Sequence, residues 1–148
     1  MKSLNAAKHP EIGKTSYGTI KTLESLPNNT NTIVTSDISL SPGLWEIELQ
    51  LNGFESTGSK WTLIQAVPYG TIAIVNGMNL YGERLTVPYL SNFDFSVHGE
   101  ILNYGGANSY TPHWSDYFKA TLLGGERKKR GNGKNEQKIP IPTGGGGT

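Results

Sequence analysis

The chain has 148 residues, a formal net charge of +1, 35% hydrophobic residues and no cysteine. This length fits one domain that buries its own core, and the lack of cysteine excludes disulfides, thiol nucleophiles and thiolate metal sites. No stretch approaches the roughly 20 apolar residues of a membrane helix, and the first residues lack the apolar run of a secretory signal, so we expect synthesis in a cytoplasm and no membrane insertion.

The first part of the chain is poor in periodic patterns. Residues 1–19 alternate in neither the helical nor the strand period and are predicted to be an N-terminal arm. Residues 20–24 are predicted as a short strand and residues 32–40, which are rich in β-branched side chains, as a longer one. The turn residues Ser41-Pro42-Gly43 end this run.

The clearest pattern follows at residues 44–51. Apolar Trp45, Ile47, Leu49 and Leu51 alternate with Glu46, Glu48 and Gln50. Because successive side chains of a strand point to opposite faces, this alternation predicts a half-buried strand. Asn52-Gly53 comes directly after it and predicts a tight hairpin turn, since both residues tolerate positive φ.

Further strands are predicted at residues 61–67, 71–75, 80–87 and 117–123. Asn76-Gly77 predicts a second hairpin, and Pro88 is expected to end the strand before it. In the run that begins at Phe93, one face is apolar and the other is polar. The apolar face holds Phe93, Phe95, Val97 and Ile101, and the polar face holds Asp94, Ser96, His98 and Glu100.

About eight strands with turns at roughly ten-residue spacing are typical of an all-β sandwich or barrel. We predict an antiparallel β-sandwich over residues 20–123, an N-terminal arm over 1–19 and a C-terminal tail over 124–148. The tail is basic: residues 126–148 hold six basic and two acidic residues, a balance of +4, whereas residues 1–125 hold seven and ten, a balance of −3.

The tail contains two groups of candidate docking residues, the basic Arg127, Lys128, Lys129 and Arg130 and the apolar Ile139 and Ile141. Pro140 and Pro142 keep the apolar pair extended. Four adjacent charges without aromatic residues provide no sequence readout on a nucleic acid. We therefore expect a protein surface on a neighbouring subunit as the partner, and nucleic acid is the weaker alternative.

Motifs that suggest enzymatic chemistry are incomplete. His98-Gly99-Glu100 matches the H-x-E of zinc deaminases, but the cysteine ligands of that site do not exist here. In a strand, His98 and Glu100 are expected to be solvated. Glu46 and Glu48 are neighbours on one strand rather than carboxylates across a cleft. We expect no enzymatic activity, no cofactor, and no catalytic or metal site.

One segment favours binding. Residues 103–118 hold Tyr104, Tyr110, His113, Trp114 and Tyr117 among small polar residues. Aromatic faces of this kind either stack on the sugar rings of a glycan or pack in a subunit interface, where Tyr and Trp are enriched. The sequence leaves both alternatives open.

Two motifs suggest a family. Residues 38–47, Ile-Ser-Leu-Ser-Pro-Gly-Leu-Trp-Glu-Ile, form a strand, a Pro-Gly turn and an aromatic-containing strand, and residues 117–122, Tyr-Phe-Lys-Ala-Thr-Leu, form a final strand of aromatic and small residues. With these, residues 31–123 resemble the small jelly-roll domains of bacteriophage structural proteins, which are similar to the C1q and tumour-necrosis-factor fold.

This resemblance implies a jelly-roll sandwich, trimerisation and a place on a virion, and it supplies no catalytic residues. The basic tail departs from the pattern, because such domains often stop after the last strand. We expect a virion structural or accessory protein of the capsid or of the tail and baseplate, anchored by its terminal arms to other virion proteins. The alternative is a host-attachment domain that binds a cell-surface glycan.

Overall fold

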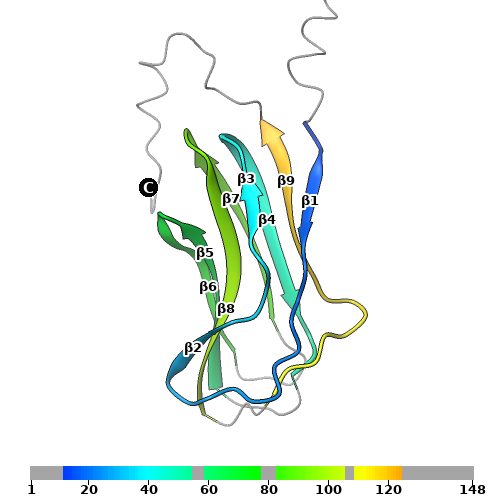
Figure 1. Ribbon diagram of the computed structural model, residues 1–148, viewed down its shortest axis with the longest axis vertical. Helices are drawn as coiled ribbons and strands as arrows, with labels where there is room; N and C mark the ends of the chain where they lie inside the picture. Colours follow the sequence, from blue (N-terminus) through cyan, green and yellow to red (C-terminus); the bar gives the residue numbers. More distant parts are fainter. Residues whose placement is uncertain (1–11, 55–58, 78–82, 106–108, 125–148) are drawn as a thin grey trace, which may run out of the picture.

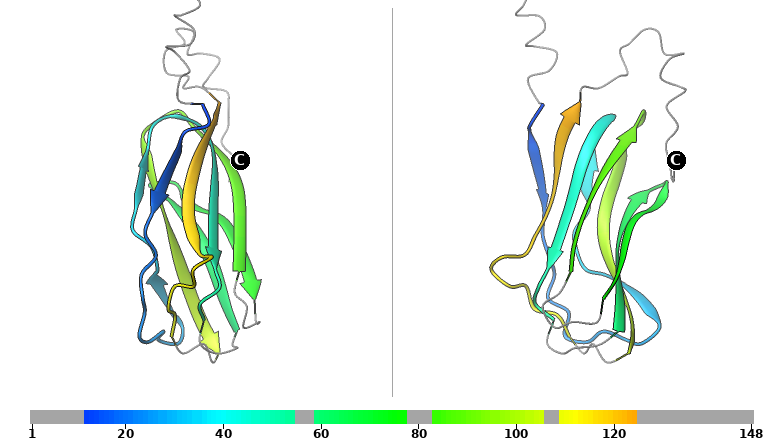
Figure 2. Two further views of the ribbon diagram at one scale, coloured as in Figure 1. Left: turned by 90° about the vertical axis from the view of Figure 1, so that its right-hand side faces the viewer. Right: turned by 180° about the vertical axis from the view of Figure 1, so that it is seen from behind.

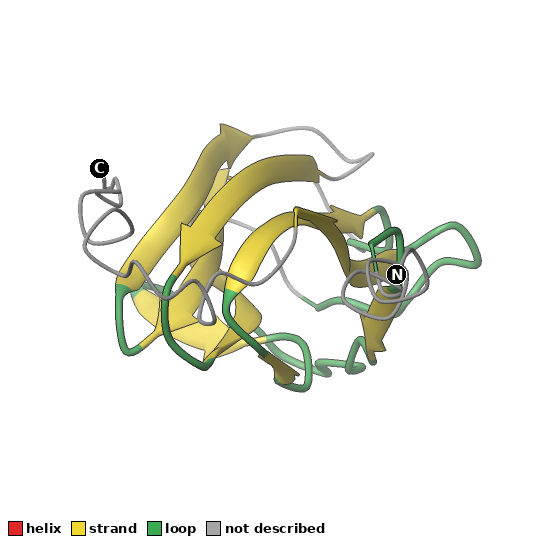
Figure 3. Ribbon diagram, turned by 90° about the horizontal axis from the view of Figure 1, so that it is seen from above, coloured by secondary structure: helices red, strands yellow, loops and turns green. Residues whose placement is uncertain are grey.

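The computed structural model describes residues 12–54, 59–77, 83–105 and 109–124. These residues form nine strands in two antiparallel sheets that face each other (Figures 1 and 2). Viewed along the strands, the sheets curve around one core (Figure 3). The predicted β-sandwich is confirmed, and two four-stranded paths with crossovers between them are typical of a jelly roll.

The first sheet has the order β1-β9-β4-β7 and the second β2-β8-β5-β6, with β3 pairing with β8 beyond the end of β2. The strands of the first sheet are β1 Thr15–Gly18, β9 Tyr117–Gly124, β4 Gly43–Leu51 and β7 Glu83–Ser91. Those of the second sheet are β2 Thr30–Ile33, β8 Phe95–Gly105, β5 Ser59–Val67, β6 Gly70–Gly77 and β3 Ile38–Leu40.

The core lies between the sheets and contains the predicted face of β4. Trp45, Ile47, Leu49 and Leu51 are all buried, as are Phe95 and Val97 on β8. The prediction for Phe93 is wrong: its side chain is 68% exposed. Phe93 lies in the bend before β8 begins, so the alternation of the strand does not extend to it.

Both predicted hairpins are wrong. β4 and β5 belong to different sheets, as do β6 and β7, so Asn52-Gly53 and Asn76-Gly77 do not join neighbouring strands. At Gly53 the absence of a side chain serves close packing instead. A Cβ there would lie 1.6 Å from the carbonyl oxygen of Thr111, and Thr111 donates its N–H to the Gly53 carbonyl at 2.9 Å.

The predicted strand boundaries also change. Residues 15–18, assigned to the arm, form β1 and pair with β9, so the sandwich begins before residue 20. Residues 20–24 contribute only isolated bridges, and residues 32–40 divide into parts of β2 and β3. β7 continues through Pro88 to Ser91, because an edge strand tolerates a residue that cannot donate a hydrogen bond.

The two chain ends leave the sandwich at the same end (Figure 1). β1 and β9 are antiparallel neighbours that pair Thr15 with Thr121, so the start of β1 lies beside the end of β9. The connection between β8 and β9 lies at the opposite end (Figure 1). The sandwich therefore has one end where the described chain begins and finishes and another end that carries the connection between β8 and β9.

Candidate functional site

The connection between β8 and β9 exposes a tryptophan. Trp114 is 90% exposed, more than any other large hydrophobic side chain in the described part of the chain. The ring of His113 lies against it, with the ring centroids 5.2 Å apart. An exposed indole offers a large apolar face with a polar N–H to a binding partner.

Asp116 holds this loop in shape. Its carboxylate accepts hydrogen bonds from the backbone N–H of Asn52 at 2.8 Å, from the backbone N–H of His113 at 3.0 Å and from the hydroxyl of Tyr110. The buried position of Tyr110, together with the carboxylate of Asp116, raises the pKa of the Tyr110 hydroxyl, which remains a donor at neutral pH. One carboxylate thus connects the core, the end of β4 and the loop.

Ser115 makes a second connection between the loop and β4. Its hydroxyl accepts a hydrogen bond from Asn52 Nδ2 at 2.9 Å, and its carbonyl accepts one from Gln50 Nε2 at 3.1 Å. The same hydroxyl lies 2.7 Å from His113 Nδ1. Ser115 is bonded to the end of β4 and His113 is bonded to Asp116, so the indole between them is presented on a pre-organised base, which lowers the entropy lost on binding.

The other aromatic residues predicted for this surface are elsewhere. Tyr110 is fully buried and packs edge-on against Phe54 with centroids 4.9 Å apart. Tyr104 and Tyr117 lie on the outer faces of opposite sheets, where their hydroxyls donate to Asn76 at 2.9 Å and to Glu48 at 3.1 Å. The structure therefore brings together His113 and Trp114 and separates the remaining three residues.

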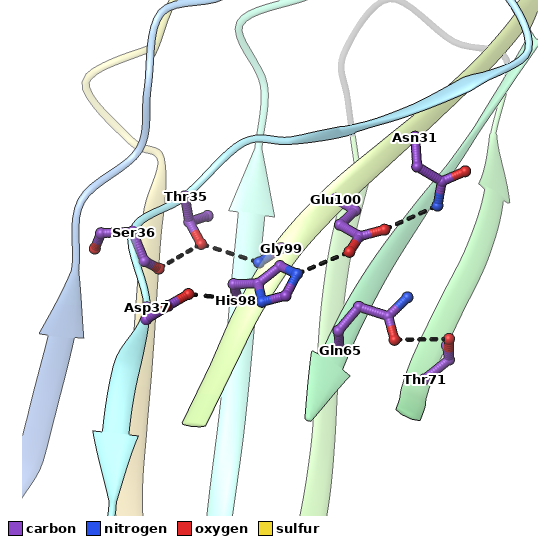
Figure 4. A network of polar contacts seen from close by, with 9 residues as sticks. All are labelled: Asn31, Thr35, Ser36, Asp37, Gln65, Thr71, His98, Gly99 and Glu100. Atoms are coloured by element: carbon purple, nitrogen blue, oxygen red, sulfur yellow. Dashed lines mark hydrogen bonds and ion pairs between the residues drawn. The ribbon is translucent and has the colours of Figure 1, made fainter. Parts of the chain in front are cut away.

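His98 and Glu100 are not the solvated pair that the sequence predicts. His98 is buried, and its Nε2 lies 2.7 Å from Glu100 Oε2 while its Nδ1 lies 3.6 Å from Asp37 Oδ1 (Figure 4). Asn31 Nδ2 donates to the other oxygen of Glu100 at 2.8 Å (Figure 4). Burial alone would raise the pKa of Glu100, but the hydrogen bonds from Asn31 and His98 outweigh it and lower that pKa.

This network connects β8 to β2 and to the residues before β3. Both ring nitrogens of His98 face carboxylates, so the side chain connects neighbouring parts of the sheet. Among the described residues, no group of three or more His, Asp and Glu side chains is placed to hold a metal ion.

The outer face of the second sheet, which carries His98, has a groove at the end where β1 begins and β9 ends. An open groove of about 590 Å³ lies over the ends of β3, β5 and β8. Its lining consists of Ser39, Leu40, Ser41, Val67, Asp94, Phe95 and Ser96. We refer to it as the serine groove.

A buried ion pair was not predicted from the sequence. Lys60 Nζ lies 3.7 Å from Glu83 Oε2 and 4.4 Å from the centroid of Phe54, and both charged residues are buried. Burial lowers the pKa of Lys60 and raises that of Glu83, and their mutual attraction opposes both shifts. No pattern could have revealed the pair, because its members are 23 positions apart in different sheets.

The predicted docking residues Arg127, Lys128, Lys129, Arg130, Ile139 and Ile141 lie outside the described residues. No protein-family model matches the chain, and a search of curated proteins finds no match. None of the described residues forms a helix that could cross a bilayer.

Proposed function

We propose that this protein is a non-enzymatic structural or accessory subunit of a bacteriophage virion, anchored through its terminal segments. The observation that carries the proposal is the division of the sandwich into two ends. The terminal segments leave from one end, and the loop with Trp114 projects near the other (Figure 1). A subunit of this form is attached to a particle at one end and contacts a second partner at the other.

The jelly roll and the motifs of residues 38–47 and 117–122 support the same proposal through their resemblance to bacteriophage structural domains. Capsid decoration and a position in the tail or baseplate both fit this arrangement. The partners are other virion proteins and further copies of the chain, most simply a trimer. The interaction is mechanical, through burial of apolar surface and addition of terminal segments to a neighbour.

The test is the presence of the protein in particles. We expect mass spectrometry of gradient-purified virions from cells that encode this chain to detect it in a fixed ratio to the major capsid protein. Light scattering of the purified protein should give the mass of a trimer. Recovery of the protein only in the soluble fraction, with none in the particles, would contradict the proposal.

A second candidate function is attachment to a host-surface glycan through Trp114. The observation that favours it is the 90% exposure of an indole held on a fixed loop. The flat face of an indole stacks on a sugar ring without needing to be ordered first. His113, which lies against Trp114, provides a polar neighbour for a hydroxyl.

The matched experiment compares Trp114→Ala with Tyr17→Ala, since Tyr17 is an aromatic residue 69% exposed on β1. Both variants should fold. If Trp114 contacts a glycan, only Trp114→Ala loses binding to host cells or their purified polysaccharide. If Trp114→Ala instead prevents trimer formation or incorporation, the loop is a subunit interface and the glycan function is wrong.

A further inference from the structure

The serine groove lies beside the point where the C-terminal segment leaves the sandwich. β9 ends at Gly124, which pairs with Leu44 at the start of β4. A Cβ on Gly43 would lie 3.3 Å from the carbonyl oxygen of Gly124, and Ser41, two residues before Gly43, lines the groove. The C-terminal segment therefore starts within a few residues of the groove's rim.

The length of chain between this exit and the basic block suits the groove. Arg127 is three residues after Gly124 and Arg130 is six residues after it. An extended chain covers roughly 3.3 Å per residue, so these four side chains start about 10–20 Å from the exit. Two packed sheets are about 10 Å apart. The block can therefore pass over the end of the sandwich and reach the outer face of the second sheet.

The chemistry of the groove is complementary to this block. Asp94 is the only charged residue among the described residues that line it, and it is exposed. Asp37 lies two residues before Ser39 on the same face and is mostly exposed, so it adds a second negative charge. Serine hydroxyls accept hydrogen bonds from ammonium and guanidinium groups, and the exposed apolar side chain of Val67 suits the methylene stem of a lysine or arginine.

We propose that residues 127–130 dock in the serine groove of the same molecule, with Asp94 as their principal charged partner. This contact fixes the direction in which residues 131–148, with Ile139 and Ile141, leave the sandwich. It depends on the fold and on the chain's own charge pattern, and it holds whether or not the protein is part of a virion.

Limited trypsin digestion of the full chain tests the proposal, because trypsin cleaves after the four basic residues only when they are undocked. Asp94→Asn should accelerate cleavage at residues 127–130 by roughly two- to fivefold, the factor expected for one exposed ion pair. Glu24→Gln is the control, because it removes one exposed negative charge near the opposite end, where its neighbour Leu23 pairs with Tyr110.

A second variant tests the groove without changing charge. Ser39→Tyr places a bulky side chain in the groove on a residue that is already exposed, and it should accelerate the same cleavages while leaving the melting temperature unchanged. Equal cleavage rates in wild type, Asp94→Asn and Ser39→Tyr would overturn the proposal. Protection that increases with protein concentration would also overturn it, because the segment would then occupy the groove of another copy.

Discussion

Replacing Asp116 by alanine should destabilise the fold and release the Trp114 loop together. The carboxylate accepts three hydrogen bonds, and two of their donors, the Tyr110 hydroxyl and the Asn52 N–H, are buried or partly buried. A hydrogen bond to a charged group contributes about 1.5–3 kcal/mol, and a buried donor left without a partner loses a similar amount. The third donor, the His113 N–H, is exposed and can bond to water instead.

Two such losses predict a decrease of about 3–6 kcal/mol in the free energy of unfolding for Asp116→Ala. Since small domains are stable by about 5–15 kcal/mol, the variant should still fold at low temperature. Tyr110→Phe should cost less, about 1–2 kcal/mol, because it removes one donor and leaves the other two bonds to Asp116. The double variant should cost less than the sum of the two, since both substitutions remove the same hydrogen bond.

Urea denaturation followed by far-UV circular dichroism measures these differences, and acrylamide quenching reports the mobility of Trp114 on its loop. Asp116→Ala should change the quenching of the exposed tryptophan in the folded protein, whereas Tyr110→Phe should change it less. A cost below about 1 kcal/mol for Asp116→Ala, or additive effects in the double variant, would show that the three hydrogen bonds do not hold the loop.

Three further predictions concern the core, a close contact and the pH dependence of stability. Trp45→Ala should cost about 3–5 kcal/mol by urea denaturation because the indole is buried, and Phe93→Ala should stay within about 0.5 kcal/mol because Phe93 is exposed; equal costs would contradict this assignment. Gly53→Ala should cost more than about 3 kcal/mol, since its Cβ would overlap the Thr111 carbonyl, whereas Gly105→Ala, whose nearest neighbour would be 3.3 Å away, should cost less than about 1 kcal/mol. Burial, with a smaller contribution from Tyr69, raises the pKa of Tyr89 to about 12. As the pH rises, the Tyr89 hydroxyl therefore loses its proton in the unfolded state before it does so in the folded state. The free energy of unfolding should be unaffected below pH of about 10 and should fall by about 3 kcal/mol as the pH rises to about 12. Tyr89→Phe should make the alkaline decrease smaller, and an unchanged decrease would contradict the assignment.

The sequence predicted best the strands that have one solvent-exposed face and one buried face. β4 is the best example, because every second residue from Trp45 to Leu51 is buried, and alternation is a local property that needs no knowledge of the partner strand. Alternation also found most of β8, whereas β5, β6 and β9 were predicted from runs of strand-forming residues between turn residues. Alternation failed at Phe93, because this residue continues the apolar pattern although it lies before the strand begins. It also failed at residues 15–18, because a strand of four residues is too short to show a pattern.

The candidate site was predicted only in part. The sequence indicated that the segment with Trp114 is a binding surface candidate, because its aromatic content alone is unusual for a loop. It could not separate Trp114 from Tyr110, since their exposure differs through contacts with Phe54, Asn52 and Gly53, which lie more than fifty positions away.

The sequence by itself determined the all-β class, which face of β4 is buried and the contrast between an acidic body and a basic tail, because each depends on composition or on neighbouring residues. Only the tertiary structure decided which strands share a sheet. Asn52-Gly53 and Asn76-Gly77 predicted hairpins from the local sequence, but Asn76 and Gly77 are the last residues of β6, and the strand that follows each pair belongs to the other sheet. The strand arrangement also placed Lys60 beside Glu83, His98 between two carboxylates and the serine groove beside the end of β9.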